Sequence, residues 1–412
     1  MSLNSVYDGE KVAVESGRHR DLRTAMMILA SVLLVLISLF LLEPQVAVDE
    51  EATYESLVKR LFDEVLEGVE DMRGLPQPES TELKIVSIQY FRDKAKEQVR
   101  KESEKISLED IVYRALFMIP QEYSIGEARV EQASAVRSAV AGNRLYIVKE
   151  NFDPQDTKAA RRTLAHEIAH ILQSENFRNP KITTSDQRQA WIALVEGDAD
   201  FTADTYMARS GLFSFTFREA VPGSLDRIKF FPYQYGSGFI SALFREGGWS
   251  LINSAYQNLP RSTEEVLHPE VFLAGGSFID VEALTPASNG FEAVFTDTFG
   301  EHFIRIMLEN GASSNEAAAA AAGWGGDNVT LFNRGESYLV TWRINWDTDE
   351  DASEFFEVFD FMVVKMGGEE VEPGLYSLQG HHITFKKHGG VTEIVSSTDK
   401  PWVLSVMKLM NP

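Results

Sequence analysis

The chain has 412 residues, of which 44% are hydrophobic, so it is long enough and apolar enough to form two or three folded domains. Its 62 acidic residues outnumber its 39 Lys and Arg residues, and the resulting net charge of −23 disfavours nucleic-acid binding. The absence of cysteine excludes disulfides, iron–sulfur clusters and thiol nucleophiles. Any metal site must therefore use His, Asp or Glu side chains.

An uncharged segment near the N-terminus predicts a membrane span. Residues 25–42 carry no charge, and a helix of this length rises by about 27 Å, close to the thickness of a hydrocarbon core. Basic residues precede the segment and acidic residues follow it, which places residues 1–23 in the cytoplasm and the body of the chain outside the cell. We expect a retained signal anchor at residues 24–42 of a single-pass cell-membrane protein; a cleaved signal peptide is the alternative.

The rest of the chain divides into three regions. Residues 43–130 are charge-rich, with apolar residues four apart that predict an amphipathic helix in an accessory region. Residues 131–327 are expected to form a mainly helical domain. Residues 328–412 predict a small β-rich domain, in which Phe361–Lys365 and Trp402–Met407 are two of the expected strands. The predicted fold class is α+β.

The most informative motif lies on a predicted helix. Residues 144–148 predict a strand, and an acidic turn then leads into a helix expected from Thr157 to Ser174. Within this helix His166 and His170 lie four residues apart, so both imidazoles can reach one cation. Glu167 projects beside them, toward a water molecule that such a cation would bind.

A second apolar helix supplies candidate carboxylates. Glu196 lies 26 residues after His170, a spacing at which a helix hairpin could bring its carboxylate to the same cation. Asp200 lies one turn later on the same face, where it could accept the distal ring N–H of a ligand histidine. Asp198 and Asp200 remain alternatives as the third ligand. Carboxylates inside an apolar helix are costly without partners, which favours a metal site over a solvated helix edge.

The combination His166-Glu167-x-x-His170 and Glu196-x-x-x-Asp200 resembles the gluzincin class of zinc metallopeptidases, which includes thermolysin-like enzymes. The second motif is also similar to that of CAAX-processing membrane peptidases, although those carry several membrane spans. More loosely, the chain resembles uncharacterised microbial membrane-anchored zincin-like proteins. The gluzincin resemblance covers about residues 145–207.

The resemblance implies a zincin-like catalytic domain at residues 131–327, with Zn²⁺ bound by His166, His170 and Glu196. It also implies that Glu167 is the general base for a zinc-bound water, and that Asp200 supports a ligand histidine. In this class a strand before the active helix pairs with extended substrate, a role that Arg144–Val148 would fill.

A zinc peptidase usually needs a further donor for the oxyanion that develops during hydrolysis. No short motif identifies this donor here. Tyr235 and His268 are the leading candidates, and Tyr206 and Tyr233 are further ones.

The leading hypothesis is a membrane-anchored, outward-facing zinc metallopeptidase that hydrolyses a protein or peptide substrate. Its partners would be that substrate and the membrane, through one N-terminal helix, without nucleic acid. The alternative is a catalytically inactive zincin-like cell-surface binding protein, against which the intact Glu167 argues. A third possibility is a cell-surface protein in which the motif around His166 is accidental.

Overall fold

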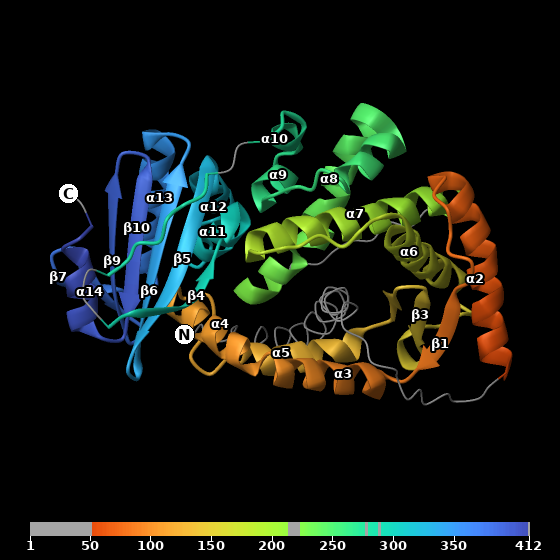
Figure 1. The fold of residues 1–412 in the computed structure, drawn as a ribbon, viewed down its shortest axis with the longest axis horizontal. Helices are drawn as coiled ribbons and strands as arrows, with labels where there is room; N and C mark the ends of the chain where they lie inside the picture. The colour runs from red at the N-terminus through yellow and green to blue at the C-terminus, as the bar shows by residue number, and fades with distance from the viewer. Residues whose placement is uncertain (1–51, 213–222, 277–278, 287–289, 411–412) are drawn as a thin grey trace, which may run out of the picture.

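The structure is a computed structural model that describes residues 52–212, 223–276, 279–286 and 290–410. The molecule is elongated, with a large sheet at one end and a mainly helical part at the other (Figure 1). The helical part contains α2 (Ala52–Arg73), α3 (Ile88–Lys101), α4 (Ser103–Ala115), α5 (Ile125–Gln132), α6 (Thr157–Asn176), α7 (Ser185–Arg209), α8 (Ser224–Ala255), α9 (Thr263–Leu267), α10 (Pro269–Leu273) and single 3-10 turns at Ala133–Ala135 and Lys149–Asn151.

A three-stranded sheet precedes α6. It consists of β1 (Glu82–Val86), β2 (Ser138–Ala141) and β3 (Arg144–Val148), in the order β1-β3-β2. The central strand β3 is parallel to β1 and antiparallel to β2, and Gly142 has the positive φ that the tight turn between β2 and β3 requires. Both edges of β3 are therefore occupied, so the expectation that Arg144–Val148 pairs with substrate is not met. The two edge strands are β1 and β2.

The helix α2 belongs to the same core as α6. Its apolar residues recur at helical spacing, so they form one stripe that faces the interior. The buried members of this stripe are Val58, Leu61, Phe62, Val65, Val69 and Met72. They pack in one cluster with apolar residues of β3 and α6. The region predicted to be accessory thus contributes directly to the packing of α6.

The C-terminal part is built on a seven-stranded antiparallel sheet with strand order β4-β5-β6-β10-β9-β8-β7. The strands are β4 (Glu292–Asp297), β5 (Trp324–Arg334), β6 (Ser337–Trp346), β7 (Glu369–Glu372), β8 (Leu375–Leu378), β9 (His381–His388) and β10 (Val391–Ser397). The helices are α11 (Gly300–Leu308), α12 (Ser314–Ala321), α13 (Asp349–Lys365) and α14 (Lys400–Met407).

Helices pack on both faces of this sheet, because neighbouring residues of a strand point in opposite directions. On β6, Val340 and Trp342 join the cluster that holds α11, α12 and α13. Leu339 instead joins the cluster that holds α14. The two helical layers leave the central strands buried on both sides.

The prediction of a small β-rich domain was wrong in extent. The sheet is large, and β4 joins it from before residue 328. Two predicted strands are helical: Phe361–Lys365 is the last part of α13, and Trp402–Met407 lies in α14. Both segments form helices rather than strands because the side chains of Thr348 and Asp399 cap the N-termini of α13 and α14. Each helix then buries one apolar face.

One buried carboxylate ties this sheet to a helix. Asp327 of β5 accepts hydrogen bonds from the backbone N–H groups of Phe299 and Gly300, at the start of α11. The indole N–H groups of Trp324 and Trp342 donate to the same carboxylate, each at 3.0 Å. Four donors thus satisfy a charge that would be costly to bury alone.

Within the part of the chain that the structure describes, no helix combines the length and the apolar character that a membrane span requires. The predicted α+β class is confirmed. The predicted transmembrane helix is overturned by this finding, and so is the predicted location as a single-pass membrane protein with an extracellular body. The segment at residues 24–42, on which they were based, lies outside the described residues.

Candidate metal centre

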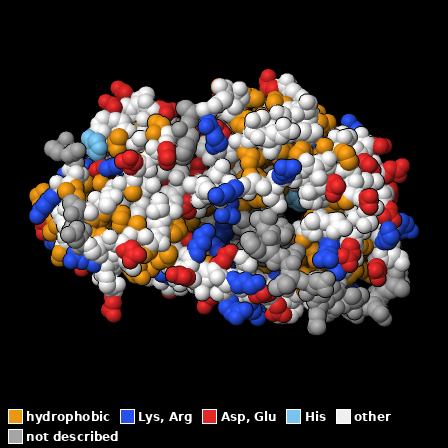
Figure 2. Space-filling model, viewed as in Figure 1, with side chains coloured by type: hydrophobic (Ala, Val, Ile, Leu, Met, Phe, Trp, Pro, Cys, Tyr) orange, Lys and Arg blue, Asp and Glu red, His pale blue; other side chains and the backbone are white. Residues whose placement is uncertain are grey.

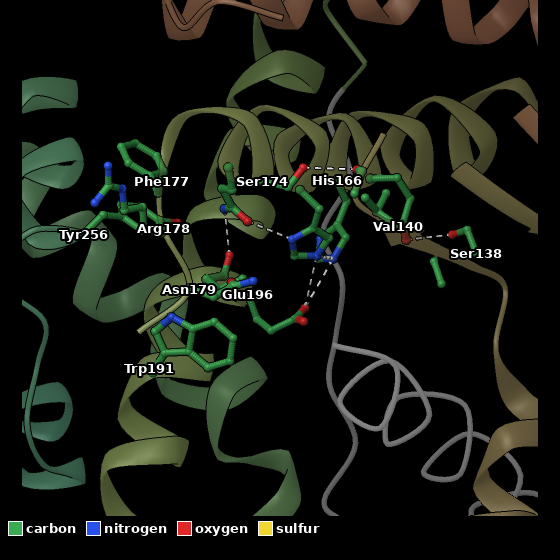
Figure 3. Close-up of a pocket in the computed structure, with 16 residues that line it drawn as sticks. Ser138, Val140, His166, Ser174, Phe177, Arg178, Asn179, Trp191, Glu196 and Tyr256 are labelled. Carbon is green, nitrogen blue, oxygen red and sulfur yellow. Dashed lines mark hydrogen bonds and ion pairs between the residues drawn. The ribbon is translucent and has the colours of Figure 1, made fainter. Parts of the chain in front are cut away.

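The motif His166–His170 lies on α6, which begins and runs as its sequence predicts. The side chain of Asp156 caps the helix by accepting a hydrogen bond from the backbone N–H of Ala159. One face of α6 is buried against α2 and β3 through Leu164, Ile168 and Ile171, among other residues. The two histidines lie on another face, where their Nε2 atoms approach Glu196 of α7; Figure 3 labels His166 and Glu196.

The third candidate ligand lies on α7, which packs against both α6 and α8. Glu196 is only 1% exposed. The next residue, Gly197, meets Gly236 of α8 so closely that a Cβ atom at either position would overlap the backbone of the other helix. This glycine contact lets α8 press directly on the turn of α7 that carries Glu196.

Three donor atoms converge between the two helices (Figure 3). Glu196 Oε2 lies 3.3 Å from His166 Nε2 and 3.7 Å from His170 Nε2. The two Nε2 atoms are 3.0 Å apart. One ligand atom from each residue lies within 4.8 Å of the others, so His166, His170 and Glu196 form a group that could hold a metal ion.

The hydrogen bonds around the two rings favour a cation at this point. Asp200 Oδ1 lies 3.1 Å from His166 Nδ1, and Gln173 Oε1 lies 2.8 Å from His170 Nδ1. Both oxygens are acceptors, so each Nδ1 donates, and in the neutral imidazoles each Nε2 carries a lone pair. Two lone pairs that face each other at 3.0 Å repel unless a positive charge lies between them.

The surroundings of the third candidate ligand, Glu196, also favour a cation. Both carboxylate oxygens of Glu196 are buried without a hydrogen bond of good geometry from the described residues. A carboxylate in such a position is costly unless a cation compensates it. Two imidazole nitrogens and one carboxylate oxygen are a donor set that suits Zn²⁺. The residues present therefore fit a zinc ion.

Electrostatics draws positive charge to the same place. Burial lowers the pKa of His166, but the hydrogen bond with Asp200 and the adjacent carboxylate of Glu196 outweigh this effect and raise that pKa to about 10. Burial raises the pKa of Glu196, but the charges of the adjacent His170 and His166 lower that pKa to about 2. A proton or a metal ion would neutralise this group of ligands.

Of the three carboxylates on this stretch of α7, only Glu196 faces the Nε2 atoms. Asp200 lies at the opposite side of the His166 ring, where it also accepts from Arg162 at 3.1 Å. Asp198 Oδ2 accepts from Arg73 at 3.1 Å and from Tyr256 at 2.9 Å. The geometry therefore favours Glu196 over the two aspartates as third ligand, and it leaves Asp200 in the supporting position.

Glu167 borders the same cavity and is nearly buried. Its Oε1 accepts a hydrogen bond of 2.8 Å from the hydroxyl of Ser138, on the edge strand β2. This bond fixes the carboxylate beside the two histidines. A carboxylate held there can accept a proton from a water molecule in the cavity.

The cavity has a volume of about 330 Å³ and lies between β2, α6, α7 and the end of α8. Phe177 and Tyr256 stack on one side with ring centroids 3.9 Å apart, and Trp191 lines the cavity with them. Figure 2 shows a histidine side chain in a hollow of the helical part. The cavity combines an aromatic wall with the candidate metal ligands.

The structure does not bring the predicted oxyanion donors into this cavity. Tyr235 packs against Phe231 and His302, and His268 forms an ion pair with Glu301 at 3.2 Å. The tyrosine in the lining is Tyr256, which follows the last residue of α8. Its local sequence carries no motif, so only the packing of α8 reveals it.

The comparisons with known proteins concern mainly the other end of the chain. Residues 288–401 match a family model described as Domain of unknown function (DUF8575), which covers the C-terminal sheet and excludes the candidate metal centre. No curated protein matches the chain.

A solved structure from Chloroflexus aurantiacus, provisionally named a hydrolase with a novel fold, is similar over 62% of this chain and 97% of its own. The identity is 17% and the TM-score is 0.35. A likeness of this size carries no argument about the activity of this chain.

Proposed function

We propose that this chain is a zinc-dependent metallopeptidase that hydrolyses peptide bonds. The observation that carries the proposal is the convergence of His166, His170 and Glu196 on one point, with Glu167 beside them in the same cavity. Three protein ligands with a fourth position left for water are the usual arrangement of catalytic zinc sites. Structural zinc sites instead use four protein ligands.

Zinc in this position would polarise the scissile carbonyl and lower the pKa of a bound water toward about 7. Glu167 would accept the proton from that water and later pass it to the leaving amine. The hydroxyl of Ser138 would hold Glu167 in place for both transfers. Asp200 would keep the Nε2 lone pair of His166 directed at the metal.

The shape of the cavity supports an extended peptide as substrate. The edge strand β2 lines it through Ser138, Ala139 and Val140, and no described strand pairs with its outer edge. An extended peptide could therefore add to β2 by backbone hydrogen bonds. Trp191 and Phe177 offer an apolar surface for one of its side chains.

The test is the Glu167→Gln variant of the full chain, assayed with zinc and a mixture of unstructured peptides. We expect peptide hydrolysis to fall by roughly 10²–10⁴-fold, because the amide cannot accept the proton, while about one zinc per chain is retained. The matched control is Glu175→Gln, which changes an exposed carboxylate on the same helix and should leave the rate unchanged. Equal rates for parent and Glu167→Gln, or no hydrolysis by the zinc-loaded parent, would refute the proposal.

A further inference from the structure

A chain of buried hydrogen bonds connects α2 to the second histidine of the metal centre. It runs from Arg73, the last residue of α2, to Asp198 on α7, then to Gln173 on α6 and finally to His170. We call Arg73, Asp198 and Gln173 the Asp198 relay. All three side chains are buried, although Arg73 and Asp198 are 125 residues apart in sequence.

The relay determines how the amide of Gln173 is oriented. Its nitrogen donates to the backbone carbonyl of Val195 at 3.0 Å and to Asp198 Oδ2 at 3.1 Å. Both of these atoms can only accept, so the amide cannot be turned around without the loss of two hydrogen bonds. The amide oxygen must therefore face His170 Nδ1, which lies 2.8 Å away.

Asp198 is itself held from several directions. Its Oδ2 accepts from Arg73, Gln173 and Tyr256, which come from three different helical segments. Arg73 also donates to Asn253 Oδ1 at 3.1 Å, and its guanidinium lies over the Trp249 ring at 4.2 Å. The position of Asp198 thus depends on the packing of α2 and α8 against α7.

We propose that Gln173 is a positioning residue for the metal, which holds His170 in the tautomer and ring orientation that direct Nε2 at the cation. The Asp198 relay holds Gln173 in turn. This inference rests on the metal site of the proposed function, but not on its catalytic activity. It makes α2 part of the support for the metal centre, rather than an accessory segment.

The two ligand histidines would then be supported by different chemistry. His166 faces the carboxylate of Asp200, which is backed by Arg162. His170 faces the neutral amide of Gln173. The charged pair Arg73–Asp198 lies behind this amide and does not contact the ring. A neutral partner adds no further negative charge next to the site, and its oxygen still fixes the tautomer by accepting from Nδ1.

The test compares the zinc affinity of the full chain with that of Gln173→Met, by competition with a chromophoric chelator. Methionine has similar length, but its sulfur is only a weak acceptor for the His170 N–H, so we expect binding to weaken by about 10–100-fold. The visible spectrum of the Co²⁺-substituted protein should change, because the His170 ring is no longer fixed. Gln187→Met, on the first turn of α7, is the matched control and should keep the parent affinity.

Melting of the metal-free proteins separates positioning from folding. A purely structural role would lower the melting temperature of Gln173→Met without weakening zinc binding by the folded protein, and that result would overturn the proposal.

The outcomes also distinguish this inference from the proposed function. If the parent binds zinc tightly and Gln173→Met binds it within threefold, the relay proposal fails and the peptidase proposal stands. If zinc binding weakens as expected but the parent hydrolyses no peptide, the relay proposal stands and the peptidase proposal fails. If the folded parent binds no metal, both fail.

Discussion

Replacement of Arg73 by methionine should destabilise the protein severely, because it leaves a buried carboxylate without its cation. The side chains of Arg73 and Asp198 are 1% and 0% exposed, and they are joined at 3.1 Å. Removal of one partner of a buried ion pair costs about 3–5 kcal/mol. Methionine keeps most of the apolar stem, so this cost reflects mainly the lost charge, the hydrogen bonds to Asp198 and Asn253, and the contact of the guanidinium with Trp249.

Urea unfolding of the metal-free full chain, followed by circular dichroism, would measure the change in the free energy of unfolding. The matched control is Lys59→Met, on the same helix, which breaks an ion pair with Asp63 whose side chains are 64% and 56% exposed. That change should cost less than about 1 kcal/mol. A loss below about 1 kcal/mol for Arg73→Met as well would refute the argument that the buried pair holds α2 against α7.

Three further changes test the packing around the site and the sheet. Gly197→Ala should destabilise the fold by about 1–3 kcal/mol or more, because its Cβ would overlap Gly236. The control is Gly238→Ala, on α8, where the added Cβ would meet no other side chain or backbone atom, so this change should be neutral or slightly stabilising. Burial lowers the pKa of His302 to about 3. Below pH 6.5 the unfolded chain therefore binds a proton at His302 that the folded chain does not bind. The free energy of unfolding should then fall as the pH drops from 6.5 toward 3. His302→Phe should remove this loss, which reaches about 5 kcal/mol at 1.36 kcal/mol per pH unit. Asp327→Asn should cost about 2–4 kcal/mol, since an amide cannot accept from all four donors.

Each of these changes has a clear contrary result. Equal melting temperatures for Gly197→Ala and Gly238→Ala would mean that α7 and α8 are not in close contact. Parallel curves of unfolding free energy against pH for the parent and His302→Phe would mean that His302 is not kept neutral by the fold. An Asp327→Asn variant as stable as the parent would mean that the Asp327 carboxylate does not anchor α11 to the sheet.

The ligand helices could be predicted from the sequence because helix periodicity is local. Residues four apart on a helix share a face, so the pairs His166/His170 and Glu196/Asp200 define their own geometry before any tertiary contact is known. The capping residue of α6 marks where that helix begins. The division of labour between Glu196 and Asp200 then follows from which ring nitrogen each one meets.

The supporting contacts could not be predicted, because they join segments that are distant in sequence. Nothing near Arg73 indicates that it pairs with Asp198, and nothing near Tyr256 indicates that it lines the cavity. The role of β3 was misjudged for a related reason: pairing order decides which strand lies at an edge, and β2 occupies that edge. In the C-terminal part, short apolar runs such as Phe361–Lys365 fit a strand and a helix equally well until the length of α13 is known.

The most direct test of the account is the zinc content of the purified full chain, measured by elemental analysis beside the Glu196→Ala variant. Convergence of His166, His170 and Glu196 predicts about one zinc per parent chain and a large loss in the variant, with both proteins folded. A folded parent that takes up no zinc, or a Glu196→Ala variant that keeps the full amount, would contradict the assignment of the site.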